Sequence, residues 1–159
     1  MKKKYFISIT IVLAIILLDQ STKLYVERVM PIHDPITIIE DFFHIVHVRN
    51  TGGAFGIMAD QGLFLRVFFI IISIVAIFII PFFLIKLKGH QIVPITGLSL
   101  IMAGAIGNLI DRLRLGEVID FIDLHWYSYH WPTFNLADSA ITIGGIFLII
   151  EILFIKEAF

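Results

Sequence analysis

The sequence predicts a mainly α-helical integral membrane protein: a bundle of four transmembrane helices with a small extracytoplasmic β-structure. Of the 159 residues, 58% are hydrophobic and only 16% are charged, which is too few polar residues to cover a soluble core. Four apolar runs each approach the roughly 20 residues needed to span a hydrocarbon layer about 30 Å thick. Between these runs, two segments change from helical to alternating periodicity.

The whole chain, residues 1–159, is predicted to be a single membrane domain because the apolar runs leave little sequence for anything else. The predicted spans are about 5–26, 63–85, 92–110 and 136–155. The first span is interpreted as a membrane helix and not as a cleaved signal peptide, because no small-x-small cleavage pattern follows Leu18. The sequence contains no cysteine, which excludes a disulfide and a thiol nucleophile within this chain.

The distribution of basic residues predicts the orientation. Lysines at 2–4, 86, 88 and 156 all fall on one side of a four-span chain, and basic residues in short loops stay in the cytoplasm. Both termini are therefore predicted to be cytoplasmic, and the segments of about 27–62 and 111–135 to be extracytoplasmic. The opposing basic residues are Arg28, Arg49, Arg112 and Arg114.

Three short strands are predicted in the extracytoplasmic segments. Side chains alternate at 36 and 38 and at 44, 46 and 48, and residues 118, 120 and 122 then alternate with 119, 121 and 123. The aromatic stretch HWYSYHWPTF at 125–134 follows the third strand. Such rings prefer the headgroup region, so we expect this stretch on the outer membrane surface.

Two groups of polar residues within the spans need an explanation, because an ionisable group at the centre of a membrane helix costs about 2.5 to 3.5 kcal/mol on insertion scales. Asp19 and Lys23 share one helix face and, taken alone, are interpreted as an interfacial ion pair that snorkels. Gly104, Asn108 and Arg112 recur every four residues as a small and polar stripe. Close helix packing, with the asparagine bonding between helices, explains this stripe equally well.

Asp120 and Asp138 are the candidate catalytic pair. Asp138 sits three residues after Asn135, the spacing of a helix cap, and capping alone would account for it. Asp120 lies 18 residues earlier, in a segment that must return across the bundle to reach the fourth span. Two carboxylates that meet cannot both ionise cheaply, so one keeps a proton while the other can activate water. This is the chemistry of an aspartic peptidase.

Two other sites were weighed. Asp120 and Asp123 are three apart on a predicted strand and therefore face opposite sides, so they cannot serve one water molecule. A metal site is conceivable, but no spacing matches a known zinc or iron motif, and no metal is expected. Its ligands would come from Asp123, His33, His44, His47, His125 and His130.

Five motifs together resemble the lipoprotein signal peptidase family, signal peptidase II, over nearly the whole chain. They are DQSTK at 19–23, RNTGGAFG at 49–56, GNLIDR at 107–112, VIDF at 118–121 and FNLADSAI at 134–141. The resemblance implies a multi-pass enzyme of the bacterial cytoplasmic membrane, with its extracytoplasmic strands forming a cradle. It implies cleavage of diacylglyceryl-modified prolipoproteins just before the lipidated cysteine.

The resemblance also implies roles for individual residues. Asp120 and Asp138 would be catalytic, and Asn50 and Arg112 would bond the substrate. The residues that would line or support the site are Asp19, Lys23, Asn50, Gly52, Gly104, Asn108, Arg112 and Asn135. The implied enzyme is a monomer in membrane lipid that needs no cofactor, binds no nucleic acid and is blocked by cyclic peptides such as globomycin.

Two other functions remain open from the residues alone. A small proton-coupled or ion-coupled transporter would also carry acids, amides and bases in a helix bundle, but its sites would lie near the midplane. Here the polar groups gather at one end, which disfavours transport. A non-catalytic membrane scaffold would keep the helices without needing two converging acids.

Overall fold

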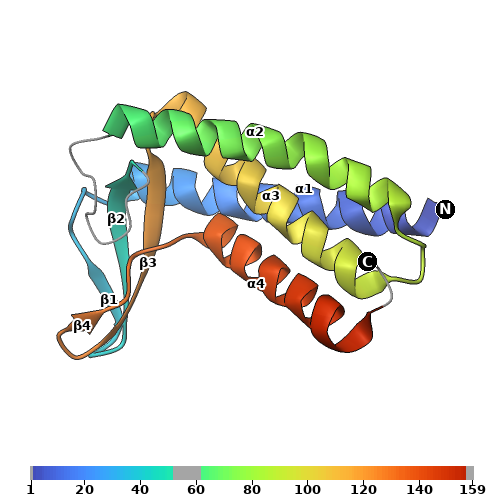
Figure 1. Ribbon diagram of the computed structural model, residues 1–159. Helices are drawn as coiled ribbons and strands as arrows, with labels where there is room; N and C mark the ends of the chain where they lie inside the picture. The colour runs from blue at the N-terminus through green and yellow to red at the C-terminus, as the bar shows by residue number, and fades with distance from the viewer. Residues whose placement is uncertain (1, 52–61, 157–159) are drawn as a thin grey trace.

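The computed structural model describes residues 2–51 and 62–156, and it places four long helices beside a small antiparallel sheet (Figure 1). The helices are α1 (Lys2–Val29), α2 (Gly62–Lys86), α3 (Ile92–Arg114) and α4 (Leu136–Ile150), and α4 continues into a π-helical turn, η3 (Glu151–Ile155). In the described part of the chain, four helices are long and apolar enough to cross a membrane, as predicted. α3 continues four residues beyond the end expected from sequence.

α3 is the central helix of the bundle and packs against each of the other three. Small residues allow α3 and α4 to approach closely, as helices do in lipid. A Cβ atom added to Gly97 would lie 2.9 Å from the carbonyl oxygen of Gly144. One added to Gly104 would collide with the carbonyl oxygen of Ala137. This packing holds the first turn of α4 directly against α3.

The surface of the bundle is apolar and part of its interior is polar. Phe64, Phe78 and Phe154 are 62%, 75% and 77% exposed, whereas Lys23 and Asp111 are completely buried. This is the reverse of a soluble domain, where large apolar side chains gather inside and charges remain in water. The arrangement suits a lipid solvent around the helices.

The sheet contains β1 (Ile36–Ile39), β2 (Phe43–Asn50), β3 (Val118–Trp126) and β4 (Tyr129–His130), in that order and antiparallel throughout. The first three strands confirm the alternating patterns. β4 was not predicted, because its two residues lie inside the aromatic stretch and show no alternation. Trp126, Tyr127, Tyr129 and Trp131 around it are exposed, and their placement at the membrane surface stays a prediction.

An apolar cluster attaches the sheet to the end of α1. Val26 and Met30 pack there against Ile119 and Phe121 of β3. Figure 1 shows the sheet at one end of the helix bundle, with the start of α1 and the end of α4 at the other. The cluster therefore aligns β3 over the same end of the bundle at which α4 begins.

Candidate active site

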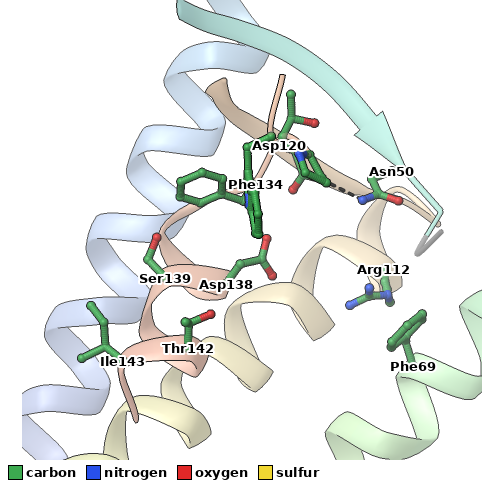
Figure 2. A pocket seen from close by; sticks show the side chains of 12 residues that line it. Asn50, Phe69, Arg112, Asp120, Phe134, Asp138, Ser139, Thr142 and Ile143 are labelled. Atoms are coloured by element: carbon green, nitrogen blue, oxygen red, sulfur yellow. Dashed lines mark hydrogen bonds between the residues drawn. The ribbon is translucent and has the colours of Figure 1, made fainter. Parts of the chain in front are cut away.

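Asp120 and Asp138 face one cavity where the sheet meets the helices (Figure 2). Asp120 lies on β3 and is 1% exposed, whereas Asp138 lies in the first turn of α4 and is half-buried. The cavity has a volume of about 670 Å³. Its other lining residues are Asn50, Phe69, Arg112, Trp131, Pro132, Thr133, Phe134, Ser139, Thr142 and Ile143. The convergence inferred from sequence is present in the structure.

Asn135 joins the two carboxylates. It caps α4: its Oδ1 accepts from the backbone N–H of Asp138 at 2.9 Å, and its own N–H donates to Asp138 Oδ2 at 3.3 Å. Its Nδ2 donates to Asp120 Oδ1 at 2.7 Å. The expected helix cap therefore exists, but the capping residue also bonds the second acid. Capping and site formation are one arrangement, and the sequence alternatives do not exclude each other.

The environment of Asp120 favours its protonated form. Burial, reinforced by the charge of Asp138, raises the pKa of Asp120 from an ordinary 3.8 to about 7. Hydrogen bonds from Asn50 and Asn135, together with the Lys23 charge, oppose this rise. Near neutral pH, Asp120 can therefore exchange a proton readily, as a catalytic acid or base must.

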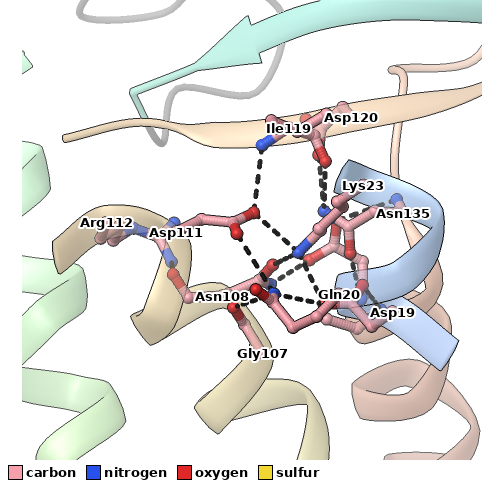
Figure 3. Close-up of polar contacts among 12 residues, drawn as sticks. Asp19, Gln20, Lys23, Gly107, Asn108, Asp111, Arg112, Ile119, Asp120 and Asn135 are labelled. Carbon is pink, nitrogen blue, oxygen red and sulfur yellow. Dashed lines mark hydrogen bonds and ion pairs between the residues drawn. The ribbon is translucent and has the colours of Figure 1, made fainter. Parts of the chain in front are cut away.

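A buried ionic cluster lies beneath the two acids and is drawn in Figure 3. Lys23 Nζ is 2.9 Å from Asp19 Oδ2, 2.9 Å from Asp111 Oδ2 and 3.0 Å from Asn108 Oδ1. Lys23, Asp19 and Asp111 have no exposed side-chain surface. The interpretation of Asp19 and Lys23 as a snorkelling pair is therefore wrong. A second acid from α3 completes the pairing and keeps the lysine inside.

The cluster connects three helices to the site. Asp19 Oδ1 accepts from the backbone N–H of Ala137 at 3.0 Å, which links α1 to the start of α4. Asn108 Nδ2 donates to Asp138 Oδ1 at 2.7 Å, so α3 contacts the candidate acid directly. Asn108 thus bonds between helices, as the packing explanation proposed, and does so at the site itself.

Asn50 and Arg112 present hydrogen-bond donors at the cavity. Asn50, at the end of β2, donates from Nδ2 to Asp120 Oδ2 at 2.9 Å. The Arg112 guanidinium lies 4.8 Å above the ring of Phe69. Its buried Nε has no hydrogen-bond partner in the part of the chain that the structure describes. Of the remaining expected site residues, Gly104 supports the site through helix packing, and Gly52 lies outside the described residues.

The family model for signal peptidase (SPase) II matches residues 11–154 of this chain. The chain belongs to the signal peptidase II family. It is 45% identical to the lipoprotein signal peptidase of Geobacter sulfurreducens over 96% of this chain and 95% of that protein. It is also 45% identical to the lipoprotein signal peptidase of Staphylococcus carnosus, over 97% and 96% of the two chains. A solved bacterial membrane enzyme, 39% identical, matches with a TM-score of 0.83 over 94% of this chain and 89% of the other.

Two residues of the ionic cluster, Asp111 and Gln20, lie inside the motifs of this signal peptidase II chain but were not among the expected site residues. Asp111 accepts a hydrogen bond from the backbone N–H of Ile119 and forms an ion pair with Lys23. Gln20 Nε2 lies within hydrogen-bond distance of Asp19, of Asp111 and of the Gly107 carbonyl. The spacing of Asp111 three residues after Asn108 on one helix could have indicated it. Gln20 gives no such signal.

His44, His125 and His130 form a separate cluster on the sheet of this signal peptidase II chain. Asp123 Oδ1 is 2.9 Å from His130 Nδ1, and His125 Nε2 is 3.2 Å from His44 Nε2. Asp123 is not among the residues that line the cavity, as the alternation of the strand predicted. Within residues 2–51 and 62–156, no group of three or more histidine, aspartate or glutamate side chains is arranged to hold a metal.

Proposed function

We propose that this chain is a membrane-embedded aspartic endopeptidase that removes the signal peptide from diacylglyceryl-modified prolipoproteins, cleaving before the lipidated cysteine. The observation that carries the proposal is the pairing of Asp120 and Asp138 at one cavity, bridged by Asn135. Membership of the signal peptidase II family supports the reaction class and the substrate.

The reaction uses the two carboxylates on one water molecule. The ionised carboxylate takes a proton as the water attacks the scissile carbonyl, and the protonated one donates to the carbonyl oxygen. Two acids in this environment share one proton near neutral pH, and the raised pKa of Asp120 supports such a state. Exclusion of water by the helices and the sheet strengthens these electrostatic interactions.

Other cavity residues suit a lipid-anchored peptide. Asn50 and the guanidinium of Arg112 are donors for backbone carbonyls of the substrate. Phe69, Phe134 and Ile143 supply apolar surface on the same cavity. A substrate held by its own helix and acyl chains reaches this site by diffusing sideways in the membrane. The cavity is also the place where a cyclic peptide such as globomycin would compete.

The same proposal assigns supporting roles and an orientation. Three sets of contacts would hold the site in shape. They are the contacts of Lys23 with Asp19, of Asn108 with Asp138, and of Asn135 with both acids. The chain would lie in the bacterial cytoplasmic membrane as a monomer, with both termini in the cytoplasm and the cavity at the extracytoplasmic face. The lysines at 2–4, 86 and 88 support this orientation.

The transporter alternative fits the structure less well. Among the described residues, the buried ionisable groups at the other end of the bundle are Lys4 and Glu151. Between the two ends, the buried residues Leu98, Ser99 and Ala103 of α3 are not ionisable. A transport site would lie near the midplane between two repeats, whereas the acids here sit at the junction with the sheet. A scaffold would have no use for two acids at one cavity.

The test is cleavage of a synthetic prolipoprotein peptide by the purified protein in detergent. The lipidated peptide should be cut before its modified cysteine, and the same peptide with an unmodified cysteine should remain intact. Asp120→Asn should abolish the reaction, while the matched variant Asp123→Asn, three residues along the same strand, should retain it. An intact lipidated peptide, or cleavage that survives Asp120→Asn, would reject the proposal. Ion uptake into proteoliposomes without cleavage would favour the transporter.

A further inference from the structure

The hydrogen bonds around Asp138 have a fixed direction. Lys23 Nζ is only a donor, so the atom of Asn108 that faces it at 3.0 Å must be the acceptor Oδ1. The other end of the same amide, Nδ2, then necessarily points at Asp138 Oδ1, 2.7 Å away. Lys23 is held in turn by Asp19 and Asp111. Asn108 therefore cannot turn to accept a proton from Asp138.

The second oxygen of Asp138 is also committed as an acceptor. Asp138 Oδ2 takes the backbone N–H of Asn135 at 3.3 Å, and a backbone N–H can only donate. The carboxylate lies in the first turn of α4, where the helix dipole favours negative charge. The Arg112 cation also interacts favourably with Asp138. All four influences favour a negative charge on Asp138.

Asp120 lies in a different environment. It sits on a strand, without a helix dipole, and is nearly inaccessible at 1% exposure. The charged groups that face it are Asp138 from α4 and, more weakly, Lys23 from α1, while Arg112 on α3 also interacts with it. It accepts hydrogen bonds from two neutral amides, Asn50 of β2 and the α4 cap Asn135, and both lower its pKa. Burial dominates, and the like charge of Asp138 adds to it, so the pKa of Asp120 lies near 7.

We propose that Asp120 holds the shared proton of the pair and that Asp138 is the ionised member, fixed in that state through Asn108 by the buried Lys23. This deepens the proposed function and rests on it for its catalytic meaning. Lys23 is then a positioning residue, because it holds the Asn108 amide that donates to Asp138.

The assignment gives each acid one role in the reaction. Asp138 takes a proton from water as the water oxygen forms its bond to the scissile carbon. Asp120 gives its proton to the carbonyl oxygen, which leaves a neutral tetrahedral diol. The C–N bond then breaks as Asp138 returns its proton to the leaving nitrogen. Asp120 recovers a proton from a diol hydroxyl as the carbonyl forms again, so the starting protonation is restored.

The experiment is a carboxyl ¹³C NMR titration of the parent protein in detergent micelles without substrate, from pH 5 to pH 9. Each resonance is assigned by its loss in Asp120→Asn or in Asp138→Asn. The Asp120 resonance should move with a midpoint near pH 7, while that of Asp138 keeps the ionised position. The assignment would be overturned if the Asp138 resonance moved instead, if both resonances moved equally, or if neither moved.

A second variant tests the protonation of Asp120 without needing activity. Asn50 donates to Asp120 and thereby lowers its pKa, so Asn50→Leu should shift the Asp120 midpoint to higher pH and leave the Asp138 resonance in place. If the Asp120 midpoint moves to lower pH or does not move, the assignment of the proton to Asp120 is wrong. Because neither titration uses substrate, failure of the cleavage assay would reject the proposed function while leaving this assignment standing, and the reverse also holds.

Discussion

The buried Asp120 should make the stability of the protein depend on pH, and Asp120→Asn should remove this dependence. The folded protein holds the pKa of Asp120 near 7, whereas an ordinary value of 3.8 applies to the unfolded chain. Between these two values the folded state binds the proton and the unfolded state does not. The free energy of unfolding therefore falls as pH rises from about 4 to about 7, and it levels off above.

The magnitude follows from the size of the pKa change. At about 1.36 kcal/mol for each pKa unit, the rise from 3.8 to about 7 corresponds to roughly 4 kcal/mol of stability at the upper limit. For a chain of this length that is on the order of 10 °C in melting temperature. An asparagine keeps the shape of the protonated acid and cannot ionise. The variant should match the parent near pH 4 and melt at a higher temperature at pH 8.

The assay is thermal unfolding of both proteins in one detergent at several pH values. The quantity of interest is the difference between their melting temperatures. Asp34→Asn is the control, because this carboxylate is exposed and lies away from the cavity. The difference between Asp120→Asn and the parent should grow with pH, while that for Asp34→Asn stays flat. A constant or shrinking difference for Asp120→Asn would refute the reasoning about burial.

Four further outcomes are expected. Asp138→Asn should stop cleavage and also lower stability by about 0.5 to 1 kcal/mol, because both carboxylate oxygens accept a hydrogen bond and an amide offers only one acceptor oxygen; full activity with a normal melting temperature would remove it from the pair. Lys23→Met should cost about 3 to 5 kcal/mol, since it leaves buried acids unpaired, and an unchanged melting temperature would contradict a buried cluster. Gly104→Val should lower both melting temperature and turnover by pushing α3 away from α4; a neutral result would mean that the helices can separate at no cost. Glu151→Gln, at the other end of the bundle, should cleave at the parental rate, and lost turnover in a folded variant would contradict a site confined to one end.

The sequence alone determined the features that depend on neighbouring residues. Apolar runs near 20 residues predicted the four helices because length and hydropathy are local properties. Alternation predicted the strands that became β1, β2 and β3. The cap spacing of Asn135 and Asp138 predicted the start of α4, which the structure confirms. The motifs also indicated the family to which the chain belongs.

Tertiary structure decided everything that depends on partners distant in the chain. Asp19 and Lys23 have the spacing of an exposed ion pair, and only the approach of Asp111 from α3 makes their burial tolerable. Gln20 joins them through contacts about 90 residues away along the chain. Asn135 is an ordinary cap in the sequence, and its bond to Asp120 exists because β3 returns over the start of α4. Helical and strand periods report which face a side chain occupies, but the groups that meet that face, and therefore its charge state, are set by packing.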